Sequence, residues 1–404
     1  MLRRMLLFVL ISFAFADEPE RIILNLTDSP ENSIAVTWRT RDKQMTGLVN
    51  YAEATDWTEF KAQTISQKAL TTEFITDEND TVWHHSAVMQ GLKPSTQYIY
   101  RVGSESSWSE WNQFKTADSA PLKFVFLGDP QNGLKEHCSR LFRSACKTAS
   151  DADFWLFSGD LVSEPEDWQY RDFFYAAGFI FRTLPSVMTP GNHDRSFEFK
   201  DGEIVLDEDG DKERLERVAE EWRMHFTLPE NGPDEYKETS YHFDYKGVRF
   251  IMIDSNDEEK LHEQTEWIES LLADNPNKWT IISFHYPFYS AGRNRDNDDT
   301  RNAFQPLFDK YYVDLVLTGH DHAYARSYKI VNGNKVGWED KGTVYVVSVA
   351  GPKMYSVNSN YDHLMAKTGG NVQLFQVITV KDSVLEYTSY TVTGTEYDRF
   401  VLNK

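Results

Sequence analysis

The pattern of hydrophobic and polar residues divides the chain into two regions. From residue 17 to about 118, short runs alternate between the two kinds, as in SIAVTWRT, where Ile34, Val36 and Trp38 share one face. Turn sequences such as DSPEN and GLKPST separate these runs. Many short alternating strands at this spacing predict an all-β sandwich. We expect its large side chains to form a core, and the region shows no catalytic pattern.

After Pro121, apolar strand-like runs alternate with stretches of helical periodicity. The helical stretches cover residues 136–150, 167–178, 211–226 and 263–275. Strands that alternate with helices predict an α/β domain over residues 119–404, joined to the sandwich by a linker at 115–124. The predicted fold class is therefore a multidomain α+β chain, with an all-β domain over residues 17–118 followed by an α/β domain.

The N-terminus, MLRRMLLFVLISFAFADEPE, has the pattern of a secretory signal peptide over residues 1–16. Two arginines precede an apolar run of roughly 11 residues, and the small-residue pattern at 14–16 predicts cleavage after Ala16. The alternative is a membrane anchor, but a bilayer span needs about 20 apolar residues. We therefore expect a secreted protein without stable membrane insertion.

The formal net charge of −21 argues against nucleic-acid binding. Such an acidic surface repels phosphate backbones, so nucleic acid is not an expected partner. The acidic stretch LDEDGDKE resembles a calcium-binding loop, but Gly210 is the fourth residue from Asp207, whereas that loop needs glycine at the sixth. We interpret this stretch as a solvated loop.

The chain has two cysteines, Cys138 and Cys146. They lie eight residues apart in a predicted helix. This spacing separates their Cα atoms by roughly 12 Å, and a disulfide needs less than about 7 Å. Both are expected to be free thiols. Asn25 and Asn79 begin glycosylation sequons, which predict a glycoprotein only for secretion from a eukaryotic host.

Five apolar runs in the second region end in polar side chains of the kind that binds metal ions. They end at Asp129, at Asp160, at Asn192 and His193, at His285, and at His320 and His322. One such residue alone indicates only a turn or a buried histidine. In open α/β sheets, however, ligands bind at the carboxyl ends of strands, so five such ends together predict one metal centre.

The ligand types restrict the metal. Carboxylates, imidazoles and an amide without a thiolate suit Zn, Fe, Mn, Co or Ni rather than a cysteine-based structural zinc site. Six or seven ligands are more than one ion with an open position uses, whereas two ions that share one carboxylate use them well. The set therefore predicts two metal ions.

The order of these motifs, Asp, Gly-Asp, Gly-Asn-His, His and Gly-His-x-His, resembles the signature of the calcineurin-like metallophosphoesterases. In the first region, GLKPSTQYIYRVG is similar to a signature of fibronectin type III domains. With GNHD, HYPFYSAG and GTVYVVSVAGPKMY behind it, the chain resembles the purple acid phosphatases over nearly all of its mature length. The resemblance implies a metal-dependent phosphoric ester hydrolase whose α/β domain has two packed β-sheets flanked by helices.

The resemblance also implies a role for each residue. One ion would be bound by Asp129 and His322, the other by Asn192, His285 and His320, with Asp160 bridging both. His193 would face the substrate, as a proton donor or a ligand of a phosphate oxygen. Asp321, between two of the imidazoles, is expected to point away from the ions and to accept a hydrogen bond there.

Two positions depart from the purple acid phosphatase pattern. Ser163 stands where those enzymes carry the tyrosine that binds ferric iron and gives the colour. Gln131 stands where they carry glycine, and we predict that its amide oxygen supplies the missing ligand, with a turn or capping role as the alternative. A neutral amide in place of a phenolate favours divalent ions at both sites, chosen among Fe, Zn and Mn. We therefore expect a colourless enzyme.

Four residues near HYPFYSAG are candidates for the substrate pocket. Arg293 and Arg295 would add positive charge, although a solvated loop is the more frequent explanation for such residues. Tyr286 and Tyr289 line the pocket or, as an equally good explanation, pack in the core.

The expected function is that of a secreted phosphatase that hydrolyses phosphate monoesters of small molecules by attack of a metal-bound hydroxide. Two alternatives stay open. One is a phosphodiesterase with the same metal centre, and the other is a surface-binding protein with a decayed enzyme domain. No feature of the sequence indicates an oligomeric state.

Overall fold

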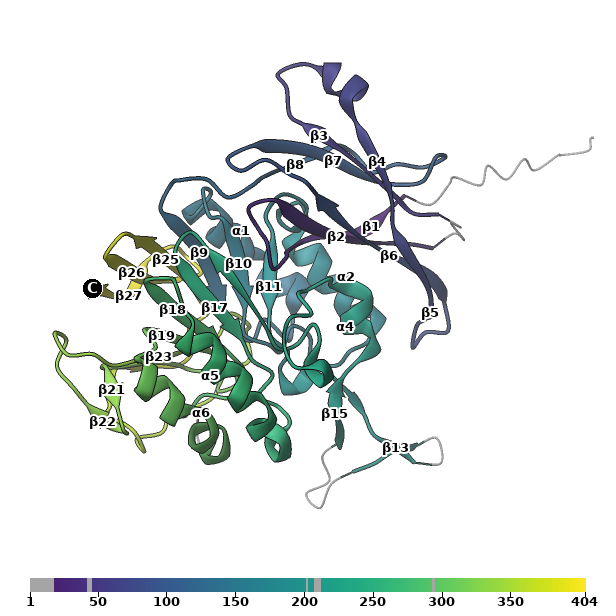
Figure 1. The fold of residues 1–404 in the computed structure, drawn as a ribbon. Helices are drawn as coiled ribbons and strands as arrows, with labels where there is room; N and C mark the ends of the chain where they lie inside the picture. The colour runs from purple at the N-terminus through teal and green to yellow at the C-terminus, as the bar shows by residue number, and fades with distance from the viewer. Residues whose placement is uncertain (1–17, 42–45, 201–202, 207–211, 293–294) are drawn as a thin grey trace, which may run out of the picture.

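The computed structural model describes residues 18–41, 46–200, 203–206, 212–292 and 295–404 (Figure 1). The predicted signal peptide, most of the stretch LDEDGDKE and Arg293 lie outside these residues. Within the described residues, a β-sandwich at one end adjoins a larger layered region of sheets and helices (Figure 1).

The first domain is a β-sandwich, as predicted. One sheet has the order β4 (Ile65–Lys68), β3 (Leu48–Glu53), β7 (Gln97–Gly103) and β8 (Asn112–Lys115). The other contains β1 (Glu20–Leu26), β2 (Ser33–Thr40), β6 (Thr81–Gln90) and β5 (Leu70–Ile75). Ile34, Val36 and Trp38 of β2 are buried in the core. The opposite face of β2 is buried as well, because it contacts the second domain through Thr37 and Thr227, whose hydroxyl oxygens lie 3.0 Å apart.

The two domains share one β-sheet. β1 pairs in parallel with β11 (Ser186–Met188), so a sheet of the sandwich continues into the central sheet of the second domain. The Asn25 side chain donates to the Ser186 carbonyl at 3.0 Å and accepts from the Thr227 amide at 3.2 Å. Because Asn25 is buried, a glycan at this sequon is incompatible with the packing, whereas Asn79 is exposed. The connection from β8 to the next strand spans residues 116–121, and the domain boundary at 118 stays a prediction.

A buried ion cluster also joins the domains. Arg21 and Arg39 of the sandwich both contact Asp167, the first residue of α2 (Asp167–Ala177), at 2.8 and 2.5 Å. His225, the last residue of α4 (Glu220–His225), lies 2.9 Å from Arg21. Since a buried charge is costly without its partner, this cluster holds the sandwich and α2 in one relative orientation.

The second domain contains two packed β-sheets, as the resemblance implied. The first continues from β11 through β10 (Phe154–Phe157) and β9 (Leu122–Leu127) to β25 (Leu374–Lys381), β26 (Val384–Thr391) and β27 (Glu396–Asn403). The second has the order β16 (Tyr241–Tyr245), β17 (Val248–Met252), β18 (Trp279–Ser283), β19 (Leu315–Thr318), β23 (Val344–Val347), β20 (Tyr324–Ser327) and β24 (Met365–Gly369). The rings of Phe124, Phe154 and Phe250 pack between the sheets, with centroids 5.2, 5.3 and 5.4 Å apart.

Helices cover the outer faces of both sheets (Figure 1). α1 (Ser139–Thr148), which follows a π-helical turn at Leu134–Cys138, packs with α2 on the first sheet, and α5 (Thr265–Ala273) and α6 (Asp298–Tyr311) cover the second. Alternation decides which way each strand residue faces. Phe250 and Ile281 face the first sheet, whereas Ile251 and Ile282 pack with Phe304 of α6. The shorter elements are α3 (Ile180–Thr183), β21 (Ile330–Val331) and β22 (Asn334–Lys335).

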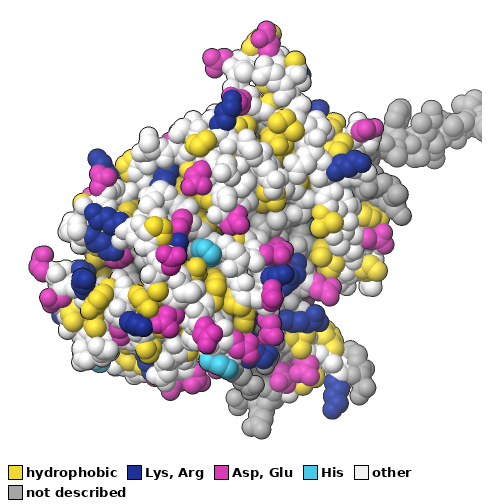
Figure 2. Space-filling view, in the orientation of Figure 1, with side chains coloured by type: hydrophobic (Ala, Val, Ile, Leu, Met, Phe, Trp, Pro, Cys, Tyr) yellow, Lys and Arg dark blue, Asp and Glu magenta, His cyan; other side chains and the backbone are white. Residues whose placement is uncertain are grey.

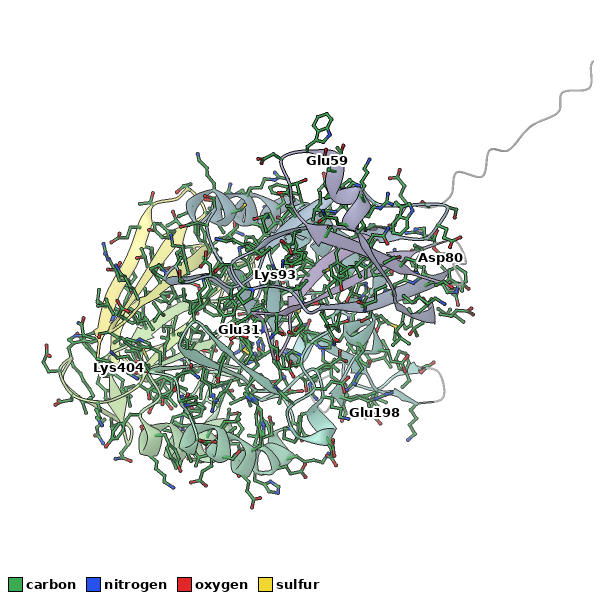
Figure 3. The ribbon with its side chains drawn as sticks, turned by 45° about the horizontal axis from the view of Figure 1, so that its top comes forward. Glu31, Glu59, Asp80, Lys93, Glu198 and Lys404 are labelled. Atoms are coloured by element: carbon green, nitrogen blue, oxygen red, sulfur yellow. The ribbon has the colours of Figure 1, made fainter. Side chains whose placement is uncertain are left out.

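Three of the four predicted helices are present, and the prediction of a helix over 211–226 is largely wrong. Its middle forms strand β15 (Arg214–Val218), and of the described residues there only α4 is α-helical. β15 pairs with β12 (Arg195–Phe197), and this tertiary pairing overrides the local helical preference. With β13 (Phe199–Lys200) and β14 (Glu203–Ile204), these strands form an arm that projects from the body and carries Glu198 (Figures 1 and 3).

Two further expectations concern the thiols and the surface. Cys138 and Cys146 are free, as predicted, and the Cys138 thiol donates to the Pro130 carbonyl at 2.8 Å. Among the described residues, no helix is both long and apolar enough to cross a membrane. Acidic and basic side chains are interspersed over the face drawn in Figure 2, so the acidic excess does not form a single patch on this face.

Candidate metal centre

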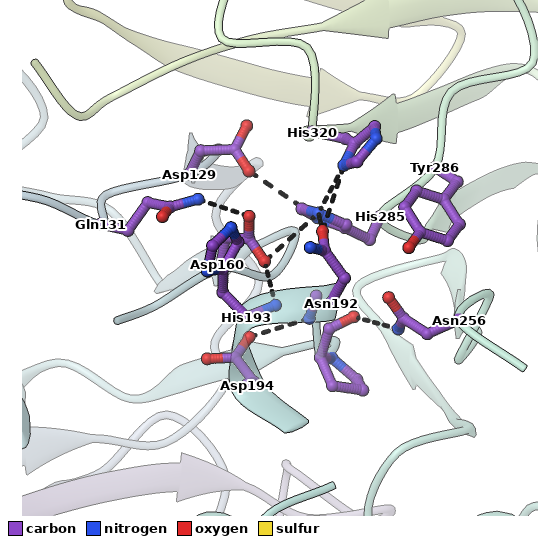
Figure 4. Close-up of polar contacts among 12 residues, drawn as sticks. Asp129, Gln131, Asp160, Asn192, His193, Asp194, Asn256, His285, Tyr286 and His320 are labelled. Atoms are coloured by element: carbon purple, nitrogen blue, oxygen red, sulfur yellow. Dashed lines mark hydrogen bonds and ion pairs between the residues drawn. The ribbon is translucent and has the colours of Figure 1, made fainter. Parts of the chain in front are cut away.

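The five sequence motifs lie on loops that leave the carboxyl ends of β9, β10, β11, β18 and β19. Four of their residues have a left-handed backbone with φ of 39° at Asp129, 51° at Asp160, 70° at His320 and 49° at His322. Residues other than glycine rarely adopt this conformation, and it costs free energy unless the surroundings enforce it. The loops therefore turn sharply after each strand, and the side chains of Asp129, Asp160 and His320 point into one space (Figure 4).

The glycines in these motifs allow the loops to approach one another closely. A Cβ atom on Gly191 would lie 2.2 Å from Asp160 Oδ1, and one on Gly319 would lie 2.8 Å from Asp129 Oδ2. Any side chain at these two positions would displace the carboxylates. Gly-Asn-His and Gly-His-x-His thus need glycine for space around the ligands as well as for the turn.

One group of polar atoms consists of an amide oxygen and two imidazole nitrogens (Figure 4). Asn192 Oδ1 lies 3.1 Å from His285 Nε2 and 3.2 Å from His320 Nδ1, and the two nitrogens are 3.3 Å apart. His285 is buried, whereas Asn192 and His320 are half-buried. Three ligand atoms that converge in this way fit one face of a metal ion.

A second group surrounds Gln131. Its Nε2 lies 2.5 Å from Asp160 Oδ2 and 3.3 Å from His322 Nε2. The Oε1 atom of Gln131 and both carboxylate oxygens of Asp129 are buried and have no hydrogen-bond partner. Buried acceptors without a partner are rare in folded proteins, and a cation beside Asp129 would satisfy its two carboxylate oxygens. Ligand atoms of Asp129, Asp160 and His285 all lie within 4.8 Å of one another.

Gln131 can supply an amide oxygen as a metal ligand if its terminal amide group is rotated. Rotation of the terminal amide by about 180° exchanges the positions of Oε1 and Nε2. Oε1 would then face Asp160 Oδ2 and His322 Nε2. Because all three atoms are acceptors, a metal ion rather than a proton fits between them. The backbone amide of Gln131 donates to the Asp160 carbonyl at 3.1 Å, so this residue also shapes the turn.

Asp160 lies between the two groups. Its Oδ1 accepts from the His193 backbone amide at 2.9 Å and lies 3.3 Å from His285 Nε2, while Oδ2 faces Gln131. Each oxygen of this one carboxylate therefore faces a different group of ligand atoms. Such a carboxylate can bridge two cations a few Å apart.

Burial and the neighbouring charges shift the pKa values of the groups in this space. Burial raises the pKa of Asp129 to about 8. Burial also opposes ionisation of Asp160, but the His285 and His193 imidazoles hold its pKa well below the ordinary value. Burial lowers the pKa of His322 to about 3 and that of His320 as well, so both rings are neutral and can bind metal. Burial opposes the charge on His285 too, but the Asp160 and Asp129 carboxylates raise its pKa to about 9, so it carries a proton that a metal ion would replace.

Hydrogen bonds to backbone carbonyls orient two of the imidazole rings. His285 Nδ1 donates to the Ser158 carbonyl at 2.8 Å and His322 Nδ1 donates to the Lys353 carbonyl at 3.1 Å, which leaves Nε2 of each ring for an ion. Asp321 points away from these atoms, as predicted. It accepts from the Ser290 hydroxyl at 2.8 Å and from the Ala291 amide at 2.6 Å.

His193 is held at the edge of the site through its other nitrogen. Its Nδ1 lies 2.6 Å from the Ser163 carbonyl, and because a carbonyl only accepts, Nδ1 carries the hydrogen. Arg214 of β15 donates to the same carbonyl at 3.1 Å and to the His193 carbonyl at 3.2 Å. The sequence did not reveal Arg214, because the segment that contains it has helical periodicity.

The remaining candidates fall into two kinds. Tyr286 is half-buried and packs edge-on against His320, with ring centroids 4.5 Å apart, so it lines the site. Tyr289 is a core residue whose hydroxyl donates to Gln305 at 3.1 Å. Arg295 reaches the site and donates to the His320 carbonyl at 2.5 Å.

Two positively charged side chains flank one tyrosine next to the site. Arg295 Cζ lies 5.1 Å and Lys353 Nζ lies 5.4 Å from the centre of the Tyr355 ring, which in turn packs edge-on against His322 at 5.0 Å. Among the described residues, no carboxylate lies within ion-pair distance of Arg295, Lys353 or Arg214. Lys353 was not singled out in the sequence, because nothing in GTVYVVSVAGPKMY indicates that this loop returns to the metal site.

Two family models match the chain. The model described as purple acid phosphatase, N-terminal domain, matches residues 19–116, and the model described as calcineurin-like phosphoesterase matches residues 122–324. Purple acid phosphatase 18 of Arabidopsis thaliana is 25% identical over 331 residues, which are 78% of this chain and 68% of that protein. Acid phosphatase type 7 of Danio rerio is 26% identical over 354 residues, which are 78% of this chain and 74% of that protein.

Solved structures agree with this assignment at the level of the fold. A purple acid phosphatase from yellow lupin (Lupinus luteus) seeds has a TM-score of 0.77 at 20% identity, over 96% of this chain and 74% of that one. PhoD has a TM-score of 0.66 at 13% identity, over 96% of this chain and 91% of that one. Since the phosphoesterase model spans half of the chain, the protein belongs to the calcineurin-like phosphoesterase family, carries the N-terminal domain of purple acid phosphatases and is a metal-dependent phosphoester hydrolase.

Proposed function

We propose that this protein is a secreted phosphatase that hydrolyses phosphate monoesters at a centre of two metal ions. The position of Asp160 is the observation that carries the proposal. Gln131 and His322 lie on the side of its Oδ2, and His285 lies 3.3 Å from its Oδ1. One carboxylate between two groups of ligand atoms supports two ions with a shared ligand rather than a single site.

The ligand set indicates which ions fit. Asp129, Gln131, Asp160 and His322 would hold one ion, and Asp160, Asn192, His285 and His320 the other. The set contains no thiolate and no phenolate, which favours divalent Zn, Mn or Fe at both positions. At the position where purple acid phosphatases carry the tyrosine ligand, this chain has Ser163, whose hydroxyl accepts a hydrogen bond from the side-chain amide of Asn132 at 2.7 Å. When bound, the two ions would supply Lewis-acid polarisation of the phosphoryl group and activation of a water molecule.

His193 is the residue that we assign to proton transfer. With Nδ1–H donated to the Ser163 carbonyl, Nε2 is the nitrogen that can give a proton to the oxygen of the departing alcohol. Burial lowers the pKa of His193 below its ordinary value of 6.5, although Asp160 opposes the shift. The protonated ring is therefore present mainly at acidic pH, and esters of weakly acidic alcohols should be hydrolysed fastest there.

Arg295, Lys353 and Arg214 explain how an acidic protein can bind an anion. Their guanidinium and ammonium groups lie beside the ligand loops and have no described carboxylate as an ion-pair partner. A phosphate ester could therefore bind beside them without breaking an internal ion pair. These three side chains add positive charge beside the ligand loops of a protein whose net charge is −21.

The test is hydrolysis of p-nitrophenyl phosphate by the metal-loaded protein and by Asp160→Asn and Asn192→Ala variants. Both variants should lose nearly all activity and part of the bound metal, as measured by elemental analysis. Asp309→Asn is the matched control, because Asp309 is a buried aspartate of the same domain on α6. Full activity in Asp160→Asn would refute the mechanism.

Two further measurements address the finer parts of the proposal. The rates on p-nitrophenyl phosphate and bis(p-nitrophenyl) phosphate decide between a monoesterase and a phosphodiesterase with the same centre. Export of the full chain, compared with a chain that begins at residue 17, tests secretion. Retention of the full chain inside the cell would count against it.

A further inference from the structure

One strand of the second sheet ends next to the metal centre without contributing a ligand. β17 pairs in parallel with β18, the strand that leads to His285, so the two strands end at the same edge of the sheet. The 254–256 segment, with the sequence Asp-Ser-Asn, follows β17, and its first two residues are buried. An acidic side chain after a buried strand has the pattern of the metal ligands, but the Asp254 carboxylate forms an ion pair with Arg195 at 3.0 Å. The role of this segment therefore lies in what its side chains contact.

The segment contacts the Asn192 loop on both sides of that ligand. Asn256 Nδ2 donates to the carbonyl of Pro190, two residues before Asn192, at 2.9 Å (Figure 4). Arg195, three residues after Asn192, donates from one nitrogen to both oxygens of Asp254 at 3.0 and 3.1 Å. Asp254 Oδ1 also accepts from Asn256 Nδ2 at 2.8 Å, which links the two contacts. Because the side chains of Arg195 and Asp254 are buried, their ion pair is costly to break.

Ser255 contacts the loop of a second ligand, His285. The backbone amide of Tyr286 donates to Ser255 Oγ at 3.1 Å. Tyr286 directly follows His285, and its ring packs edge-on against His320 with the centroids 4.5 Å apart. The ligand atoms of Asn192 and His285 lie 3.1 Å from each other. Three consecutive residues thus hold the backbone next to two of the three ligands in one group.

A buried polar network holds the segment itself. The backbone amide of Asp254 donates to Ser240 Oγ at 2.8 Å, and Gln264 Nε2 donates to the Asp254 carbonyl at 2.7 Å. The Ser240 hydroxyl donates in turn to Gln264 Oε1 at 2.6 Å. Both partners are fully buried. A buried network in which donors and acceptors are paired is rigid, so the segment is in place before any ion binds.

We propose that the 254–256 segment positions Asn192 and His285 for the ion that they would bind together with His320, and that Asn256 is the principal positioning residue. The proposal rests on the proposed function, because it concerns one of the two ions. Removal of an outer partner of a metal ligand typically lowers the affinity about 10–100-fold. Here the partner holds the backbone of a ligand loop, so its removal would let Asn192 move away from His285.

The other ion should not depend on this segment. The ligands assigned to that ion alone are Asp129, Gln131 and His322. Among the described residues, no hydrogen bond or ion pair joins these three side chains to the 254–256 segment. Their loops follow β9 and β19, and β18 separates β19 from β17. The loss of Asn256 should therefore weaken one ion selectively.

The experiment is titration of the metal-free full-length protein with Co²⁺, followed by absorption spectroscopy, and with Zn²⁺. Asn256→Ala should bind one ion like the wild type and the other about 10–100-fold more weakly. When only the stronger site is filled, its Co²⁺ spectrum should match that of Asn192→Ala, which loses a direct ligand of the affected ion. The Zn²⁺ concentration for half-maximal hydrolysis of p-nitrophenyl phosphate should rise by the same factor. Ser255→Ala, which removes only a hydroxyl group, should weaken the same ion.

Asn231→Ala is the matched control. Asn231 is half-buried like Asn256, and its Nδ2 also donates to a backbone carbonyl at 2.9 Å, that of His242. His242 belongs to β16, which carries no ligand residue. Asn231→Ala should therefore lower the melting temperature of the metal-free protein about as much as Asn256→Ala does, and it should bind both ions like the wild type.

The outcomes separate this proposal from the proposed function. Unchanged affinity for both ions in Asn256→Ala and Ser255→Ala would overturn the positioning role while leaving a phosphatase with two ions. Equal weakening of both ions would also overturn it, because that result indicates a general effect on the fold. Binding of a single ion by the wild type would instead refute the proposed centre of two ions, and this proposal with it.

Discussion

The most diagnostic single change is Gln131→Leu, because it removes the amide that we assign to a metal ion. In the metal-free protein two effects oppose each other. The variant loses the hydrogen bond from Nε2 to the Asp160 carboxylate, which is worth about 1.5–3 kcal/mol. It also removes the buried Oε1 that has no partner, which costs about 1–3 kcal/mol in the wild type. The free energy of unfolding of the metal-free protein should therefore change by about 1 kcal/mol or less.

The metal-bound protein should respond differently. Loss of an outer partner of a metal ligand typically costs 10–100-fold in affinity, so loss of a direct ligand should cost at least about 100-fold. This corresponds to roughly 3 kcal/mol in the binding of one of the two ions. Zinc should then raise the melting temperature of Gln131→Leu less than that of the wild type, because stabilisation by a ligand depends on its dissociation constant.

The assay is titration of the metal-free protein with Zn²⁺ in competition with a chromophoric chelator, together with thermal melts at several zinc concentrations. Gln376→Leu is the matched control. Gln376 of β25 is as buried as Gln131, also has an Oε1 without a partner, and donates from Nε2 to Ser348 and Ser389. Its variant should bind both ions like the wild type. If Gln131→Leu also binds both ions with unchanged affinity, Gln131 has only a role in the turn.

Three other predictions test separate parts of the molecule. His193→Ala should lower kcat on p-nitrophenyl phosphate about 10²–10⁴-fold at unchanged metal content, and a smaller loss would remove His193 from proton transfer. Lys353→Ala should raise KM about tenfold or more with little change in kcat, because a charge-assisted hydrogen bond is worth about 1.5–3 kcal/mol, and an unchanged KM would contradict a role in anion binding. Burial raises the pKa of Glu238 from 4.5 to about 7, so the fold holds a proton there that the unfolded chain releases. Its contribution to stability is fully present below pH 4.5 and is lost as the pH rises through about 7. Glu238→Gln should therefore remove about 2 kcal/mol of the loss between pH 5 and pH 7 in denaturant melts. A pH dependence identical to that of the wild type would show that Glu238 is ionised in the fold.

Local sequence was sufficient to predict those strands and helices whose formation depends on nearby residues. The alternation around Trp38 and the periodicity of the segments that became α2 and α5 predicted a sandwich followed by an α/β domain, since one face of each element must be buried. The prediction from hydrophobic periodicity is wrong at Arg214. There the strand pairing with β12 and the hydrogen bonds to distant carbonyls outweigh the helical pattern of the segment.

Some residues of the candidate site were likewise identified from local sequence, and others were not. Asp129, Asp160 and His285 were found because each follows a buried strand, and the carboxyl ends of such strands meet in one crevice. Arg214 and Lys353 were missed, because their place beside His193 and His322 depends on an arm and a loop whose paths no periodicity encodes.

The sequence by itself determined the types of ligand, their order along the chain and the strands that carry them. Only the tertiary structure decided that Asp160 lies between two groups of ligand atoms and that a sheet of the sandwich continues into the catalytic domain. The reason is physical. Hydrophobic periodicity depends on neighbours a few residues away, whereas distances between loops depend on how two sheets and their helices pack over the whole domain.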